Sequence, residues 1–179
     1  MSEDEAVSVL VLRARDGDAD AVRQLYLGFS RAVHGVLLGY VQPADADDLT
    51  HDVFEIALRQ LHDLREPAAF PGWLLSIARR AALQRLRHVP PSPVDASSLV
   101  DTTSTQETRL EAQHALAAIR SLPEAYRETL MLRLVEGMTG AEISVRTGLT
   151  PGTVRVNLHR GMGLLRKALG LVDVQEVGT

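Results

Sequence analysis

The chain has 179 residues and a net charge of −4 at pH 7, and 45 % of its residues are apolar. It has no cysteine, which excludes disulfides and thiolate metal sites and favours a cytoplasmic location. Aromatic residues make up only 4 %, so a core of Leu, Val and Ala is expected, and this favours helices over sheets. The acidic start and the short apolar runs predict neither a signal peptide nor a membrane-spanning helix.

Positive charge is concentrated in two segments of this acidic chain. Residues 1–66 contain thirteen Asp or Glu against six Arg. Residues 67–94 contain four Arg and no acid, and residues 143–172 contain four Arg, one Lys and no acid. A local patch rather than the net charge decides where a polyanion binds. Two such segments favour a nucleic-acid partner over ordinary solvated helix faces.

Apolar residues at helical spacing predict three helices in the first half of the chain. The first spans residues 19–41 and ends before Pro43, which breaks it. The second spans residues 44–64 and begins with acids, which suit a helix N-terminus. A loop with two prolines, residues 65–72, leads to the third helix at residues 73–89.

The composition changes after the third helix. Residues 88–108 are rich in Pro, Ser and Thr and have few large apolar groups, which predicts a linker rather than a surface loop inside one domain. Further helical patterns follow at residues 110–122, 123–137 and 139–148. The sequence therefore predicts an all-α protein with two small helical domains joined by a flexible linker. The expected divisions are a first domain at 1–88, the linker at 89–109, a second domain at 110–172 and a tail at 173–179.

The last two predicted helices form a helix-turn-helix. Thr139 and Glu142 stand at capping-box spacing, and Gly148 ends the first of the two helices. Thr150 and Pro151 suit the start of the second helix. In this motif the second helix enters the major groove of DNA. The small core of the motif is expected to comprise Ala141, Ile143, Leu149, Val154 and Leu158.

Basic and hydrogen-bonding residues crowd the start of the second helix. Arginine suits guanine, asparagine suits adenine, and hydroxyl groups near a helix N-terminus suit phosphate oxygens. An ordinary surface histidine is an equal alternative for His159, and the whole unit has the alternative of a hairpin that only packs against a partner. The residues expected to point outward and contact DNA are Thr150, Thr153, Arg155, Val156, Asn157, His159 and Arg160.

Both halves resemble one protein family. The segment “SLPEAYRETLMLRLVEGMTGAEISVRTGLTPGTVRVNLHRG” resembles the minus-thirty-five-binding domain of bacterial sigma factors, most closely the extracytoplasmic-function type. In the first half, “DADDLTHDVFEIAL” resembles the acidic helix with which these proteins bind core RNA polymerase, and “AFPGWLLSIARRAALQRLR” resembles their promoter-melting and minus-ten-reading segment. The resemblance spans roughly residues 8–170. Two halves in the family's order are more specific than a helix-turn-helix alone.

The resemblance implies roles for the matching positions. Arg133 matches a position that contacts minus-thirty-five DNA, and the loop from Leu64 to Phe70 matches one that helps to capture a flipped minus-ten base. Packing is the favoured role for Trp73 itself, with base stacking as the alternative. The implied minus-ten and melting residues are Leu64, Arg65, Phe70, Trp73, Arg79, Arg80, Arg85 and Arg87. The implied contacts to the polymerase clamp are Asp48, Leu49, Asp52, Val53 and Phe54, which would equally suit an amphipathic core helix.

Three positions depart from the family pattern at presumed DNA-reading sites, namely Arg80, Val156 and Asn157. The promoter sequence therefore does not transfer from the family. The spacing of the promoter elements does transfer, at about 17 base pairs or roughly 58 Å. A twenty-residue extended linker reaches at most about 66–72 Å, so it would let the two domains bind both elements.

We therefore expect a promoter-specificity subunit with no catalytic activity, no cofactor and no metal. Its six histidines are scattered without metal-ligand spacing, and it contains no phosphate-binding loop or nucleophile elbow. The implied partners are core RNA polymerase, through its clamp and flap surfaces, promoter DNA and an anti-sigma factor. The alternatives are a stand-alone DNA-binding regulator and a degenerate sigma-like module that binds polymerase or a regulator without reading DNA.

Overall fold

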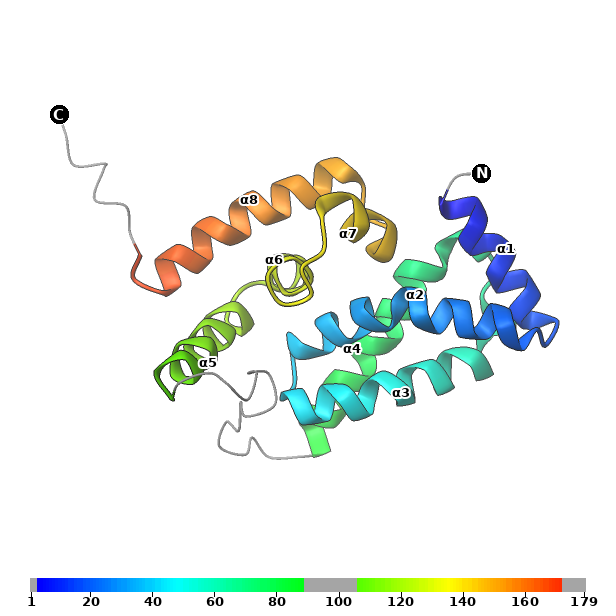
Figure 1. The fold of residues 1–179 in the computed structure, drawn as a ribbon, viewed down its shortest axis with the longest axis horizontal. Coiled ribbons are helices and arrows are strands. Elements are labelled where there is room, and N and C mark those ends of the chain that lie inside the picture. The colour runs from blue at the N-terminus through cyan, green and yellow to red at the C-terminus, as the bar shows by residue number, and fades with distance from the viewer. Residues whose placement is uncertain (1–2, 89–105, 172–179) are drawn as a thin grey trace.

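A computed structural model describes residues 3–88 and 106–171. Over these two ranges every regular element is helical and no strand occurs, which confirms the all-α prediction. We call residues 3–88 the N-terminal lobe and residues 106–171 the C-terminal lobe. Figure 1 shows the N-terminal lobe around α2 and α4, with the C-terminal lobe along one side of it. The linker predicted at 89–109 lies largely outside the described residues, but its last four residues belong to a helix that begins at Gln106.

The N-terminal lobe contains four helices and two short 3₁₀ turns. Its helices are α1 (Glu3–Arg15), α2 (Ala19–Leu38), α3 (Pro43–Arg59) and α4 (Phe70–His88). The 3₁₀ turns, Leu61–Asp63 and Pro67–Ala69, lie in the connection between α3 and α4. Helix α1 was not predicted, because only a narrow stripe of Val7, Val11 and Ala14 is buried and its other positions are mixed.

The turn between α1 and α2 is fixed by an N-cap. The Asp18 carboxylate accepts hydrogen bonds from the backbone N–H groups of Asp20 and Ala21. It also accepts one from Arg13 Nε at 2.8 Å. The hydrogen bond from Arg13 and those from the backbone lower the pKa of Asp18. The chain reversal before α2 is therefore set by local polar contacts.

The C-terminal lobe contains the predicted helices with one irregularity. Its elements are α5 (Gln106–Arg120), α6 (Glu124–Leu130), the π turn η3 (Met131–Val135), α7 (Gly140–Thr147) and α8 (Pro151–Ala168). Residues 123–137 were expected to form one helix. Instead α6 passes into the π turn, in which the Glu136 N–H donates to the Met131 carbonyl at 3.2 Å.

The helix-turn-helix has the caps that the sequence predicted. Thr139 Oγ1 accepts from the Glu142 N–H, and Glu142 Oε2 accepts from the Thr139 N–H at 2.7 Å, which completes the capping box. These bonds lower the pKa of Glu142. Gly148 ends α7 with φ +73°, a conformation that glycine adopts without strain. Thr150 Oγ1 caps α8 by accepting from the Thr153 N–H.

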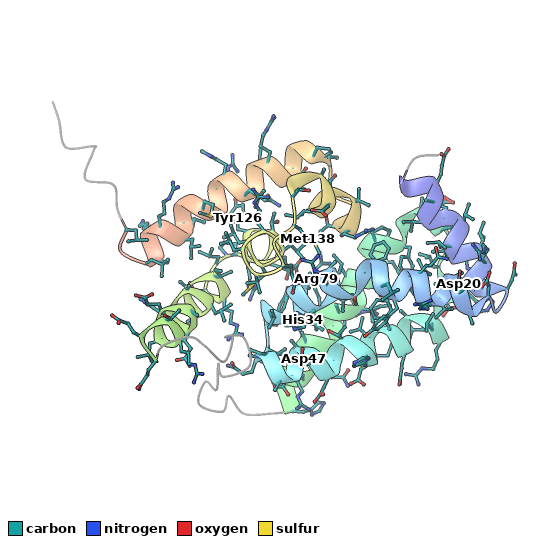
Figure 2. All side chains as sticks on the ribbon, in the orientation of Figure 1. Asp20, His34, Asp47, Arg79, Tyr126 and Met138 are labelled. Carbon is teal, nitrogen blue, oxygen red and sulfur yellow. The ribbon has the colours of Figure 1, made fainter. Side chains whose placement is uncertain are left out.

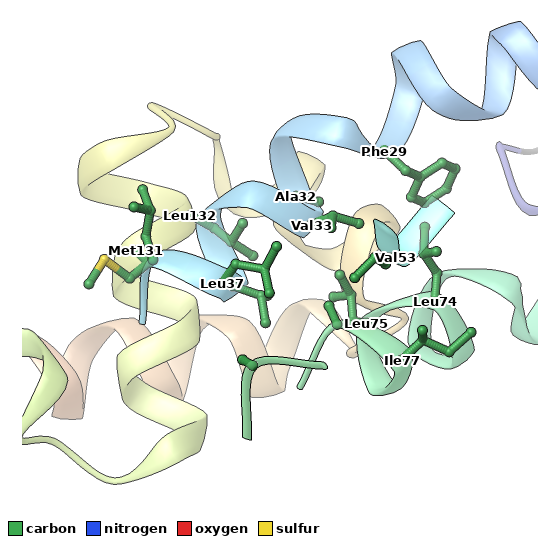
Figure 3. Packing of buried hydrophobic residues seen from close by; sticks show 14 of the residues in the cluster. Phe29, Ala32, Val33, Leu37, Val53, Leu74, Leu75, Ile77, Met131 and Leu132 are labelled. Atoms are coloured by element: carbon green, nitrogen blue, oxygen red, sulfur yellow. The ribbon is translucent and has the colours of Figure 1, made fainter. Parts of the chain in front are cut away.

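A continuous apolar core extends through both lobes. Figure 3 shows Leu37 of α2 beside Met131 and Leu132 of the C-terminal lobe, with Val33 further along the same core. Helix α2 packs against η3 and α7, and α4 packs against α7. The sequence predicted two domains held by a tether, whereas in the structure they pack directly against each other.

Candidate nucleic-acid interface

Helix α8 has a buried back and an exposed front. Val154, Gly161 and Leu165 are buried, and the back of α8 packs against α6. A Cβ atom on Gly161 would lie 3.2 Å from the Tyr126 Cβ, so the two helices approach closely at this glycine. The predicted DNA-contacting residues on the exposed front are Thr153, Arg155, Val156, His159 and Arg160.

One predicted base-reading residue faces the other way. Asn157 is only 7 % exposed, and its Nδ2 lies 3.4 Å from Thr129 Oγ1 of α6. The expectation that Asn157 points outward was therefore wrong. Its position follows from helical spacing, because Asn157 stands three residues after Val154 and four before Gly161 on the buried stripe. The buried hydroxyl of Thr129 gives the amide a polar neighbour inside the lobe.

The core of the helix-turn-helix is smaller than predicted. Ile143 and Val154 are buried, and Leu158 is half-buried. Ala141 and Leu149 were expected in this core but are exposed, Leu149 to 36 %. The hydroxyl of Ser144 donates to the Leu149 carbonyl, so a hydrogen bond from a side chain to the backbone, rather than apolar packing, holds the turn.

A groove runs between η3 and the exposed front of α8. Its volume is about 480 Å³, and both Arg133 and His159 line it. Arg133 is held in place because its Nη1 donates to the Met138 carbonyl at 3.0 Å. The sequence analysis omitted Arg166 from the site, although Arg166 follows His159 by seven residues on the same helical face. The groove is lined by Arg133, Leu134, Leu158, His159, Met162, Gly163 and Arg166.

The four arginines of α4 do not form one free patch. Arg80 and Arg87 are exposed, and Arg80 donates to the Ser76 carbonyl of its own helix. Arg85 is paired with Asp45 of α3 at 2.5 Å. Arg79 is paired with Glu128 of the C-terminal lobe at 2.7 Å, and Figure 2 shows Arg79 in the middle of the molecule.

The loop expected to capture a base has apolar side chains in the core. Leu64 and Phe70 are buried, and Phe70 meets Phe29 edge to face at 5.2 Å between ring centroids. Trp73 is half-buried against Phe70, which agrees with a packing role. Arg65 alone among the residues predicted in this loop is exposed.

Only some of the residues of α3 that were predicted to bind polymerase are exposed. Asp48 and Asp52 are exposed and Leu49 is half-buried at the edge of the core. Val53 and Phe54 are buried, and Phe54 packs on Tyr26 at 4.8 Å. The free surface of this helix is therefore its acidic face, while the two apolar residues stabilise the lobe.

Among the described residues, no group of three or more His, Asp or Glu could hold a metal ion. Within the same ranges no helix is both long enough and apolar enough to cross a membrane.

These features define an all-helical protein with a helix-turn-helix whose basic helix is exposed. Residues 25–89 match sigma-70 region 2, and residues 113–165 match sigma-70 region 4. The chain is 32 % identical to the RNA polymerase sigma factor CarQ of Myxococcus xanthus, over 91 % of this chain and 97 % of that protein. It is 31 % identical to the ECF RNA polymerase sigma-E factor of Escherichia coli K12, over 89 % of this chain and 92 % of that protein. The chain therefore belongs to the sigma-70 family of RNA polymerase sigma factors, in its extracytoplasmic-function (ECF) group.

The fold agrees with a solved member of this structural class. The structure of CnrH in complex with the cytosolic domain of CnrY superposes with a TM-score of 0.61 and 23 % sequence identity, over 93 % of this chain and 98 % of that one. As a sigma factor, the protein binds core RNA polymerase and promoter DNA, and it directs transcription initiation. It is a non-catalytic subunit, and its role in polymerase-dependent initiation, rather than the absence of catalysis, sets aside the stand-alone regulator and the degenerate module.

Proposed function

We propose that the two lobes divide promoter recognition between them. The C-terminal lobe reads the minus-thirty-five element through the exposed front of α8, and the N-terminal lobe reads and helps open the minus-ten element. The observation that carries this proposal is the acid-free front of α8, where Arg155, His159 and Arg160 lie exposed beside the groove that contains Arg133. A convex basic helix with a fixed neighbouring arginine suits the major groove and its phosphates.

Individual residues of α8 then take different parts. Arg155 and Arg160 are the candidates for guanine edges, and Val156 for a thymine methyl group. Thr150 and Thr153 lie at the capped N-terminus, where N–H groups and hydroxyls suit phosphate oxygens. Asn157 is left out of this set, because its amide is turned toward Thr129.

In the N-terminal lobe, the free positive charge on and before α4 serves the minus-ten element. Arg65, Arg80 and Arg87 are exposed and can contact the separated strand. Holding an open strand requires charge and stacking to offset about 1.4 kcal/mol per base-pair step. Leu64, Phe70 and Trp73 support this loop by packing, and Arg79 and Arg85 join the set only when their carboxylate partners release them.

We assign the polymerase clamp contact to the acidic face of α3, at Asp48 and Asp52, with Leu49 at its edge. The flap surface of the polymerase would bind the C-terminal lobe and hold it at the upstream element. We propose that the two domains that perform these roles span residues 1–88 and 110–172. The protein acts where RNA polymerase and promoter DNA are found, in the cytoplasm.

An anti-sigma factor is the second protein partner that we propose. The fold relative CnrH was solved in complex with the cytosolic domain of CnrY, so a chain of this fold accommodates another polypeptide. A regulator that covers the face of α3 containing Asp48 and Asp52 would block polymerase binding.

The test is transcription by purified core polymerase with and without the protein, on a library of genomic fragments from its own host. New start sites that share two upstream motifs are expected. Arg155→Ala should lower transcription that depends on the minus-thirty-five motif by about tenfold, since one arginine–base pair is worth ~1–3 kcal/mol. Arg23→Ala, an exposed arginine on α2, is the matched control and should leave transcription unchanged. Loss of polymerase binding in Arg155→Ala would contradict the assignment.

A further inference from the structure

Helix α1 lies against the loop of the N-terminal lobe that is assigned to the minus-ten element, residues 64–70, which we call the capture loop. We propose that Arg15, in the last turn of α1, is a positioning residue that fixes the shape of this loop and thereby sets base selectivity in the minus-ten element. This inference rests on the proposed reading of that element by the N-terminal lobe. The sequence predicted neither α1 nor a role for Arg15.

The side chain of Arg15 joins two backbone carbonyl groups at the entrance of the capture loop. Its Nε donates to the Leu61 carbonyl at 3.0 Å, and its Nη2 donates to the Leu64 carbonyl. Leu61 begins the 3₁₀ turn Leu61–Asp63, and Leu64 follows the end of that turn. The N–H groups of a guanidinium have fixed directions in one plane, so two of them together set the orientation of both carbonyls.

The Leu64 carbonyl belongs to the peptide group that leads into Arg65. Because a peptide group is planar, a bond that orients this carbonyl also orients the N–H and the Cα of Arg65. Leu64 is buried, whereas Arg65 is exposed and is a proposed contact to the separated strand. Arg15 therefore fixes the point at which the chain leaves the core and enters the capture loop.

Apolar packing alone does not determine the path of this loop. The side chains of Leu64 and Phe70 are buried at its two ends, but four of the five residues between them are exposed. At the turn before the loop, the Leu61 carbonyl accepts the Leu64 N–H only at 3.4 Å, and the bond from Arg15 is the shorter one. A buried backbone carbonyl needs a donor, and Arg15 supplies one from another helix.

Helix α1 gives Arg15 a firm support. Arg13, two residues earlier, pairs with Asp18 at 2.7 Å, and Gly17 reverses the chain with φ +85°. The helix packs on α2 and on the second 3₁₀ turn, Pro67–Ala69, which lies inside the capture loop. Figure 1 shows α1 beside the start of α2, at the end of the molecule opposite α5. The guanidinium therefore extends to the loop from a packed helix.

A loop that captures a base benefits from being fixed before the DNA arrives. A base taken out of the stack is recognised by hydrogen bonds and stacking in a close-fitting pocket. A displacement of about 1 Å is enough to weaken such contacts strongly. A loop that is already ordered also avoids the entropic cost of ordering when it binds. Arg15 thus acts through the loop, without contacting DNA itself.

The test measures base selectivity with the holoenzyme. Transcription is measured on promoters that contain every single-base substitution in the minus-ten element. The unmodified protein should have at least one position at which a substitution lowers initiation by about fivefold or more. Arg15→Met keeps the aliphatic stem but removes the donors, and it should reduce that penalty to about twofold at the position read by the loop. Dependence on the minus-thirty-five element should stay unchanged.

The ratio between promoters separates positioning from stability, because a smaller folded fraction lowers transcription on all promoters by the same factor. Arg13→Met is the matched control. It removes a bond from the same turn of α1 to Asp18 but leaves both carbonyls with their donor, so it should keep the selectivity of the unmodified protein. Arg15→Lys retains the charge without the planar fork and should recover selectivity only in part.

Two results would overturn the role of Arg15, namely full selectivity in Arg15→Met, or an equal loss of selectivity in Arg13→Met. Circular dichroism verifies that the variants are folded. If Arg15→Met does not fold, Arg15→Lys decides, and full selectivity in that variant would overturn the proposal. An unmodified protein that transcribes without any base preference in the minus-ten element would reject the proposed function itself, and the role of Arg15 with it.

Discussion

At the residue scale, residues close together on one helix differ in whether their side chains are exposed or bound by another helix. Asn157 and His159 are two residues apart on α8, yet the first lies against Thr129 and the second lines the groove. Arg79 and Arg80 are neighbours on α4, yet Arg79 is bound by Glu128 and Arg80 is exposed. Residue type alone would give each pair one role. Position on the helix gives them different roles.

The glycines of α8 provide a prediction at this scale. A Cβ on Gly161 would lie 3.1 Å from Leu130 Cδ1 and 3.2 Å from the Tyr126 Cβ, whereas nothing lies within 4 Å of a Cβ on Gly163. Gly161→Ala should therefore lower the free energy of unfolding by about 1–3 kcal/mol, because it overpacks the α6–α8 contact. Gly163→Ala should raise it by roughly 0.5–1 kcal/mol through helix propensity. Denaturant unfolding of the two variants measures this, and equal effects would contradict the close packing.

At the scale of elements, the helix-turn-helix is defined more by its caps and by hydrogen bonds from side chains to the backbone than by its core. Only Ile143 and Val154 are fully buried within the motif. The ends of its two helices are satisfied by the capping box of α7, by the left-handed Gly148 and by the Thr150 cap of α8. Local sequence therefore largely determines the backbone that positions the exposed front of α8.

Removing a cap should therefore affect stability and DNA reading together. Thr139→Ala removes the side-chain acceptor of the Glu142 N–H and should cost about 0.5–2 kcal/mol of unfolding free energy. We expect a smaller but measurable loss of minus-thirty-five-dependent transcription, since α7 positions α8. Thr139→Ser keeps the acceptor and should restore both properties. A Ser variant as unstable as the Ala variant would show that the cap is not the cause.

At the scale of the whole molecule, the contact between the lobes is sensitive to pH, because His34 of α2 lies 2.8 Å from Glu136 of the C-terminal lobe. The hydrogen bond with Glu136 raises the pKa of His34, and the charge of Asp47 adds to this effect. Nε2 of His34 lies 3.1 Å from Asp47 Oδ1 without hydrogen-bond geometry, so Glu136 is the stronger partner. Arg31 also pairs with Glu136. His51 lines a cleft of about 360 Å³ together with His34, Asp47 and Glu136.

The direction of the pH effect follows from the raised pKa. Protonated His34 strengthens the contact fully below its ordinary pKa of about 6.5, and the contribution is lost as pH rises through the raised value. The contact between the lobes should therefore weaken as the pH rises above about 6.5. Measuring the cross-linking rate of Gly72→Cys with Thr147→Cys tests this, because a Cβ at residue 72 lies 3.5 Å from the Thr147 carbonyl oxygen and both His34 and Glu136 stay intact. In that background His34→Gln should flatten the profile and His51→Gln should not, and the reverse would assign the effect to His51.

The sequence by itself determined most of the helices, though not α1 or the π turn, as well as the helix-turn-helix and the family. These features depend on local signals, so they can be recognised from the sequence alone. The signals are helical spacing, the capping box, Gly148 and the order of motifs. Only the tertiary structure decided that Val53, Phe54, Leu64 and Phe70 lie in the core, and that Asn157 faces α6. The same is true of the pairing of Glu128 with Arg79, which joins positions far apart in the chain. Such contacts depend on how two helices meet in space, and no local pattern encodes that geometry.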